Sequence, residues 1–207
     1  PRIAAEGLAD YCDMFCEQGF FSSEEGDEIL SHATRLGLKI RIHTNQFTHS
    51  GGIELAIRHK ALSVDHLEVL NDQEIDQLLL SNTKPVLLPS AAFFMRQEYP
   101  PARKMIDRGL GVILASDFNP GTSPSSNMAF VWSLACIQMK MLPEEALCAL
   151  TINPAVSLGL DEELGSIERG KTANLILTKP CKQLAFLPYS FGDSWISMIF
   201  IRGNPEN

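Results

Sequence analysis

The stretch Gly111-Val112-Ile113-Leu114-Ala115-Ser116-Asp117-Phe118-Asn119-Pro120-Gly121-Thr122-Ser123-Pro124 decides the fold. Its apolar residues are typical of a buried parallel strand, and they lead directly into Asp117 and a turn rich in Asn, Pro and Gly. Ligands in α/β sheets and barrels bind at the carboxyl ends of the strands. Asp117 is therefore predicted to be a metal ligand or a proton carrier, rather than a cap for the helix expected near Asn127.

Four earlier segments repeat this pattern of an apolar run that ends in polar residues. The runs are Tyr11 to Cys16, Lys39 to His43, Ser63 to Leu67 and Pro85 to Pro89. They begin about 25 residues apart, which is the spacing of a strand with its crossover helix. Together with Gly111 to Asp117, the runs predict five strand–helix units in a row.

Helix signals lie between these runs. Ser22 with Glu25, and Asn71 with Glu74, have the spacing of a capping box at a helix start, and Gly37 supplies a stop. Alternating strands and helices predict an α/β fold, either part of a (β/α)8 TIM barrel or a doubly wound sheet. A complete barrel takes about 250 residues, so five units are too few for one.

The pattern changes after the fifth strand. Met128 to Met139 and the segment opened by Pro143 predict helices. The residues from Gly165 onward favour β structure, with strands expected at Ala173 to Thr178 and Trp195 to Arg202. We therefore expect a partial barrel domain over residues 1–160 and the strands of a small β domain over residues 161–207.

Composition excludes several classes of partner. The net charge is −8 and no run of Lys or Arg is longer than two, which disfavours nucleic acid and anionic membrane surfaces. No apolar run approaches the roughly 18 residues of a membrane span. Five cysteines without tight pairing favour reduced thiols, so we expect a cytoplasmic protein.

Three polar residues close strands of the predicted units: His43, His66 and Asp117. A single histidine in such a place is more often a hydrogen-bonded structural residue, but three strand-end residues converge on one mouth. Imidazole and carboxylate suit zinc or iron(II), and such a metal lowers the pKa of bound water toward about 7. Asp117 would bind the metal and accept the proton of the attacking water, while His66 would polarise or hydrogen-bond the substrate.

The motifs together resemble imidazolonepropionase, a family of metal-dependent amidohydrolases of histidine breakdown. The resemblance runs from about Ala9 to Gly203. The segments that carry it are Asp13 to Glu17, His43 to Gln46, Ser63 to Leu67, Leu88-Pro89, Tyr99 to Arg103, Ser116 to Gly121, Gly165 to Leu177 and Pro188 to Gly192. It implies that the chain is the C-terminal half of such a protein, with barrel strands four to eight followed by helices and a small β segment.

The resemblance also implies a reaction and a site. The reaction is hydrolysis of 4-imidazolone-5-propanoate to N-formimino-L-glutamate by metal-activated water, with one Zn²⁺, Fe²⁺ or Fe³⁺ ion per active site in a homodimer. His43 and Asp117 would bind the metal, and His66 would lie near the reacting carbon. The residues expected to contact substrate or product are Gln46, Asn119, Gly121 and Thr122.

The chain departs from the family pattern in three respects, one of which is Asn174 in place of the Asp that is usual in the C-terminal signature of the superfamily. The family takes further metal ligands from a His-x-His on its first strand and binds the substrate carboxylate just after it, but this chain has no His-x-His. We therefore expect the chain to be inactive alone. Position 46 is Gln where many relatives have Glu, so acid–base work passes to Asp117 and His66.

Two alternative functions remain open from the sequence. An aromatic deaminase of the same superfamily would use a Glu as proton shuttle at the position of Gln46, and the amide counts against it. A non-catalytic half-barrel that serves as an assembly module would bind no stoichiometric metal.

Overall fold

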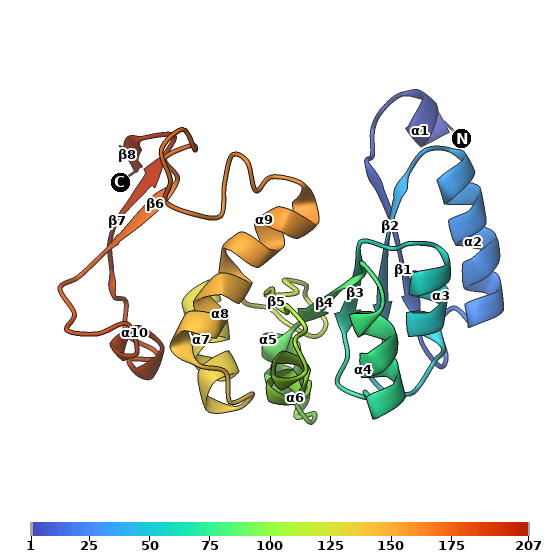
Figure 1. Ribbon diagram of the computed structural model, residues 1–207, viewed down its shortest axis with the longest axis horizontal. Helices are drawn as coiled ribbons and strands as arrows, with labels where there is room; N and C mark the ends of the chain where they lie inside the picture. The colour runs from blue at the N-terminus through green and yellow to red at the C-terminus, as the bar shows by residue number, and fades with distance from the viewer. Residues whose placement is uncertain (1, 207) are drawn as a thin grey trace. The chain divides into compact units, whose positions relative to one another are not determined.

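The computed structural model describes residues 2–206, which divide into two compact units. Unit 1 comprises the residues up to Leu88 together with Arg96–Val112. Unit 2 comprises Pro89–Met95 and the residues from Ile113 onward. Figure 1 labels the elements of both units, and each unit is described by itself.

Unit 1 is built on parallel strands that follow one another in chain order (Figure 1). They are β1 (Tyr11–Cys16), β2 (Lys39–Thr44), β3 (Ser63–His66) and β4 (Lys84–Leu87). The register pairs Phe15 with His43 and Thr44 with His66. The carboxyl ends of β2 and β3 therefore lie side by side, and all four strands begin within two residues of the predicted runs.

Helices separate these strands, as the sequence predicts. The helices of unit 1 are α1 (Arg2–Ala5), α2 (Ser23–Arg35), α3 (Gly52–Arg58), α4 (Asp72–Leu79) and α6 (Ala102–Asp107). Both predicted capping boxes are present: the Ser22 hydroxyl accepts from the backbone N–H of Glu25 at 3.2 Å, and the Asn71 side chain accepts from that of Glu74 at 3.0 Å. Gly37 follows α2 with a φ of 81°, the left-handed conformation that glycine adopts without strain.

Alternation along the strands separates the core from the opposite face of the sheet. Ile40 and Ile42 of β2 are buried, whereas Arg41 and His43, which alternate with them, are only half-buried. Because successive strand side chains point to opposite faces, His43 lies on the face away from Ile40 and Ile42. The same alternation in β1 buries Met14 and places Asp13 on the face shared with His43.

Gly52, the first residue of α3, lies directly against β2. A Cβ atom added there would be 2.0 Å from Oγ1 of the fully buried Thr44. We expect Gly52→Ala to lower the free energy of unfolding by about 1–3 kcal/mol, because buried Thr44 must move. Chemical denaturation measures this change. Gly111→Ala, where an added Cβ has nothing within 4 Å, is the matched control, and equal midpoints for the two variants would contradict the packing described.

Unit 2 begins its main segment with a short strand and continues in helices. Its elements before residue 160 are α5 (Pro89–Met95), β5 (Ile113–Leu114), α7 (Met128–Ile137), α8 (Pro143–Leu150) and α9 (Ile152–Leu158). β5 is shorter than the expected strand from Gly111 to Asp117, and the backbone at Asp117 is left-handed, with a φ of 51°. Within residues 2–206, no helix combines the length and the apolar character needed to cross a membrane.

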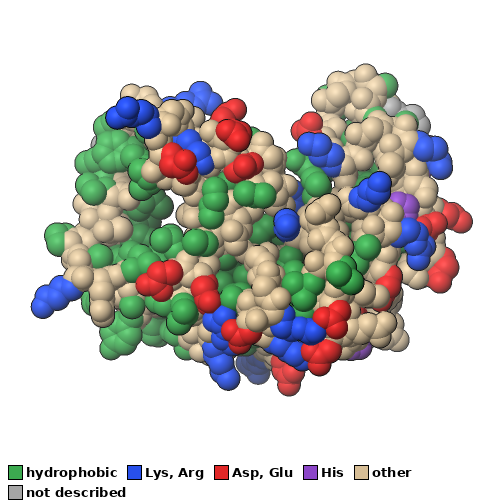
Figure 2. Space-filling model, viewed as in Figure 1, with side chains coloured by type: hydrophobic (Ala, Val, Ile, Leu, Met, Phe, Trp, Pro, Cys, Tyr) green, Lys and Arg blue, Asp and Glu red, His purple; other side chains and the backbone are tan. Residues whose placement is uncertain are grey.

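The rest of unit 2 forms an antiparallel sheet in the order β6-β7-β8. Its elements are β6 (Leu175–Thr178), α10 (Phe186–Tyr189), β7 (Ile196–Ile201) and β8 (Asn204–Glu206). This part contacts α7 through side chains. The ring centroids of Trp132 and Trp195 are 5.9 Å apart in an edge-to-face arrangement, and the Ser133 hydroxyl donates to the Pro188 carbonyl at 2.8 Å. Figure 2 shows hydrophobic side chains gathered over β6, β7 and α10. The domain boundary near residue 160 stays a prediction.

Candidate functional site

His43 and His66 lie together at the carboxyl ends of β2 and β3. Their ring centroids are 5.5 Å apart in an edge-to-face arrangement. The His66 side chain is 5% exposed and that of His43 is 28% exposed, so the pair faces solvent through His43. The structure thus brings two of the sequence-predicted site residues into one cluster within unit 1.

Left-handed backbone marks the three strand ends that carry candidate residues. The φ angles are 55° at Asn45, 88° at His66 and 51° at Asp117. Residues other than glycine seldom adopt this conformation, and such strain concentrates at functional sites because the surrounding structure must hold it in place. The left-handed residue is the candidate itself at His66 and at Asp117, whereas Asn45 lies two residues after His43 and directly before Gln46.

Two carboxylates that the sequence analysis did not assign flank His43. Nδ1 of His43 lies 3.0 Å from Oδ1 and 2.9 Å from Oδ2 of Asp13, and its Nε2 lies 4.0 Å from Oδ2 of Asp65. Burial raises the pKa of the Asp65 carboxyl, and the opposing effect of the neighbouring His43 is smaller. Alternation along β1 and β2 was the available signal for Asp13, because it places both side chains on one face.

His66 has its own carboxylate neighbour, Glu68, which sequence reasoning also missed. The two side chains are almost fully buried, and Nδ1 of His66 lies 3.5 Å from Oε1 of Glu68. Among residues 2–206, neither oxygen of Glu68 accepts a hydrogen bond. A buried carboxylate needs a charged or hydrogen-bonding partner, and His66 is placed to act as one.

In unit 2, Asp117 belongs to a turn that is organised by Asn119. Oδ1 of Asn119 accepts the backbone N–H of Gly121 at 2.8 Å and that of Thr122 at 2.7 Å. Its Nδ2 donates to the Asp117 carbonyl at 2.6 Å and to the Thr122 hydroxyl at 2.9 Å. The Thr122 hydroxyl also donates to Oδ2 of Asp117 at 3.2 Å, so the turn orients the carboxylate. Contacts of Asn119, Gly121 and Thr122 with a substrate stay predictions.

Gln46 lies in unit 1, in the loop just after β2. It is only 3% exposed. Its backbone carbonyl accepts a hydrogen bond from Nε2 of Gln97 at 3.3 Å. Within the described chain, the side-chain Nε2 of Gln46 is buried and donates no hydrogen bond. An unpaired buried donor is unfavourable, and it is a feature that an acceptor on a bound ligand would satisfy.

Comparisons with known proteins agree on one superfamily. Residues 17–205 match the amidohydrolase family. The chain is 51% identical over 203 residues to the imidazolonepropionase of Christiangramia forsetii, which covers 98% of this chain and 49% of that protein. It is 42% identical over 205 residues to the imidazolonepropionase of Caldanaerobacter subterraneus subsp. tengcongensis, again with 49% of that protein covered. The chain therefore spans about half the length of the curated relatives it matches.

Solved structures show the same fold at lower identity. An adenosine deaminase from Xanthomonas campestris with bound zinc superposes with a TM-score of 0.78 at 18% identity, covering 94% of this chain and 51% of the deaminase. E. coli guanine deaminase superposes with a TM-score of 0.72 at 16% identity, covering 90% and 52%. At these identities the likeness establishes the fold alone.

Proposed function

The chain belongs to the amidohydrolase family, and we propose that the complete protein of which it forms part hydrolyses 4-imidazolone-5-propanoate to N-formimino-L-glutamate. The observation that carries the proposal is 51% identity over 98% of the chain to a relative named imidazolonepropionase. The paired histidines at two strand ends and the strained backbone beside them support a reaction at this end of the sheet.

His43 and Asp117 would hold one zinc or iron ion, and the chemistry of the donors present fits such a metal. A neutral His43 ring that donates its Nδ1–H to the Asp13 carboxylate, which lies within hydrogen-bond distance, has its lone pair on Nε2, as is typical of histidines that bind metals. Imidazole and carboxylate serve both zinc and iron. A metal held there would lower the pKa of its bound water toward about 7 and so supply the nucleophile. By analogy with the family, a His-x-His upstream supplies further ligands.

The remaining side chains would handle the substrate and its protons. Asp117, oriented by the Thr122 hydroxyl, accepts the proton of the attacking water. His66, with Glu68 beside it, polarises the substrate carbonyl. Gln46 donates a hydrogen bond to the substrate ring. Because an amide cannot carry a proton between water and a leaving group, Gln46 favours imidazolone hydrolysis over deamination of an aromatic ring.

Substrate choice tests this function directly. The complete protein is incubated with 4-imidazolone-5-propanoate or with guanine, and products are measured by mass spectrometry. We expect N-formimino-L-glutamate from the first substrate, and no product from the second. Deamination of guanine without imidazolone hydrolysis would instead identify an aromatic deaminase, and a metal-free protein inactive on both would fit a non-catalytic half-barrel.

Asp13 gives a separate prediction about metal affinity. Asp13→Asn removes the negative charge that holds the His43 ring in its metal-binding tautomer. We expect metal affinity to fall by about 10- to 100-fold, the usual effect of losing such a partner. Titration of the metal-free complete protein with zinc measures the change. Asp10→Asn, at an exposed residue just before β1, is the control, and equal affinities for the two variants would refute the role of Asp13.

A further inference from the structure

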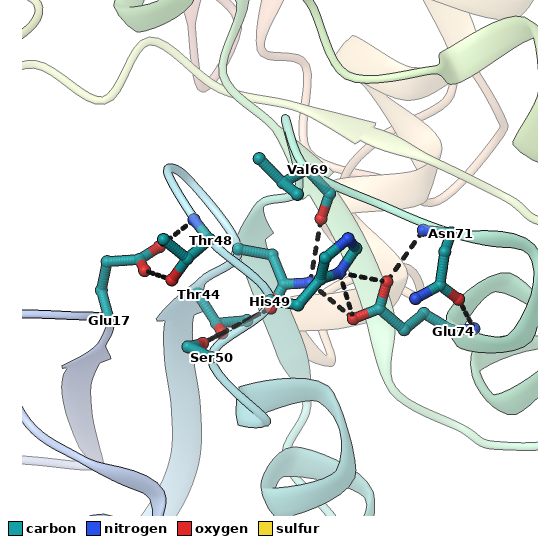
Figure 3. A network of polar contacts seen from close by, with 9 residues as sticks. Glu17, Thr44, Thr48, His49, Ser50, Val69, Asn71 and Glu74 are labelled. Atoms are coloured by element: carbon teal, nitrogen blue, oxygen red, sulfur yellow. Dashed lines mark hydrogen bonds and ion pairs between the residues drawn. The ribbon is translucent and has the colours of Figure 1, made fainter.

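Carboxylates from other elements bind the loop after β2 on two sides. The loop spans residues 45–50 and carries Gln46 near its start. Glu17 directly follows β1, and Glu74 lies in the first turn of α4. Figure 3 shows these two carboxylates at opposite sides of one polar network, with Thr48 and His49 between them.

Glu17 holds the middle of the loop. Its Oε2 accepts the backbone N–H of Phe47 at 2.9 Å and that of Thr48 at 3.3 Å, and its Oε1 accepts the Thr48 hydroxyl. Burial raises the pKa of the Glu17 carboxyl, but hydrogen bonds from Thr48, Phe47 and Gln18 outweigh burial, and the pKa is lowered overall. The loop therefore binds Glu17 in its ionised form.

Glu74 holds both ends of the loop. Its Oε1 accepts Nδ2 of Asn45 at 2.7 Å, and both of its oxygens lie 3.1 Å from Nδ1 of His49. Its Oε2 also accepts the backbone N–H of Asn71 at 2.8 Å, which anchors the carboxylate in the capping box of α4. Nδ2 of Asn45 donates to the Val69 carbonyl at 2.9 Å as well. The left-handed residue Asn45 is thus fixed to two separate segments.

These bonds determine where the chain passes at Gln46, which lies between the residues held by Glu74 and those held by Glu17. The Gln46 side-chain amide lies buried, and in residues 2–206 its Nε2 donates to no acceptor. A loop free to relax would turn this donor toward water. The hydrogen bonds to Glu74 and Glu17 hold the chain on either side of this residue.

We infer that Glu17 and Glu74 are positioning residues for Gln46, holding the loop so that the buried Gln46 amide presents its N–H to an acceptor on the substrate ring. The inference rests on the proposed function, because that function assigns the ring contact to Gln46. The two carboxylates act through the loop backbone and do not themselves touch the substrate.

The chain offers a matched pair of variants for a kinetic test. Glu25 occupies in the α2 capping box the place that Glu74 occupies in that of α4, but it is exposed and accepts from Ser22 at 2.9 Å. Glu74→Ala and Glu25→Ala both remove a capping box. A difference between their kinetic constants therefore reports the effect of losing the contacts of Glu74 with the loop. In the complete protein we expect Glu74→Ala to raise KM for the imidazolone by about tenfold with kcat nearly unchanged. Glu25→Ala should leave both constants unchanged.

A second measurement needs no turnover. Amide hydrogen exchange in the unliganded protein follows the N–H groups of Phe47 and Thr48, which Glu17 accepts and Glu74 does not touch. If the two carboxylates hold one loop, exchange at both amides should be about tenfold faster in Glu74→Ala than in Glu25→Ala.

Thr48→Ser, which keeps the hydroxyl donor to Glu17, should retain the wild-type KM, whereas Thr48→Val should raise it.

A double variant separates positioning from general stability. In a Gln46→Ala background, Glu74→Ala should raise KM no further, because the positioned amide is already absent. Multiplicative effects of the two substitutions, or equal KM and exchange for Glu74→Ala and Glu25→Ala, would overturn the inference. If the wild-type protein leaves imidazolone unchanged, the proposed function fails, and the exchange rates alone then decide whether the carboxylates hold the loop.

Discussion

Asp117→Ala is expected to lower kcat/KM for 4-imidazolone-5-propanoate by at least about 10³-fold in the complete protein, because one residue is assigned both metal binding and proton transfer. The carboxylate is held by the Thr122 hydroxyl in a turn that Asn119 organises through its own hydrogen bonds. No neighbouring group in that turn can replace it as a base. The rate of N-formimino-L-glutamate formation measures the loss.

A control for this variant removes a carboxylate elsewhere in unit 2. Asp193 is exposed in the loop between α10 and β7, and Asp193→Ala should keep the wild-type rate. The turn around Asp117 should survive the substitution, because the bonds of Asn119 go to the Asp117 backbone carbonyl rather than to its carboxylate. Near-wild-type turnover by Asp117→Ala would remove Asp117 from the mechanism.

His43→Ala is expected to abolish stoichiometric metal binding. Because the metal supplies the nucleophile, turnover should fall by about 10³-fold or more. The substitution removes the imidazole that Asp13 orients and leaves two carboxylates, Asp13 and Asp65, without that partner. Elemental analysis of the purified complete protein measures the metal per chain. His32→Ala, at an exposed position of α2, is the control and should keep its metal. An unchanged metal content in His43→Ala would show that the ion is bound elsewhere.

Much of unit 1 could be predicted from the sequence because its signals are local. Capping boxes use residues three apart, so the starts of α2 and α4 are visible without tertiary information. The apolar runs locate β1 to β4 for a similar reason, because a buried strand is a run of consecutive apolar residues. α5 was missed, because its opening Pro89 reads equally well as the end of the preceding apolar strand.

The candidate site was predictable only in part. Parallel strands bring their carboxyl ends to one edge, which is enough to expect His43 and His66 near each other. Alternation along β1 gave a signal for Asp13, but the roles of Glu68 and Glu74 were not predictable, because each depends on a side-chain direction or on the path of a loop held by distant segments. Glu17 is an example: it lies 30 residues before Phe47, whose N–H its carboxylate accepts.

The central claim is that His43 and Asp117 bind one metal ion of a hydrolytic site in the complete protein. A crystal structure of that protein, with anomalous scattering recorded at the zinc and iron edges, tests it most directly. The account predicts a single strong anomalous peak, coordinated by the His43 imidazole and the Asp117 carboxylate. A peak bound by neither residue, or no peak in a protein that still hydrolyses the imidazolone, would contradict it.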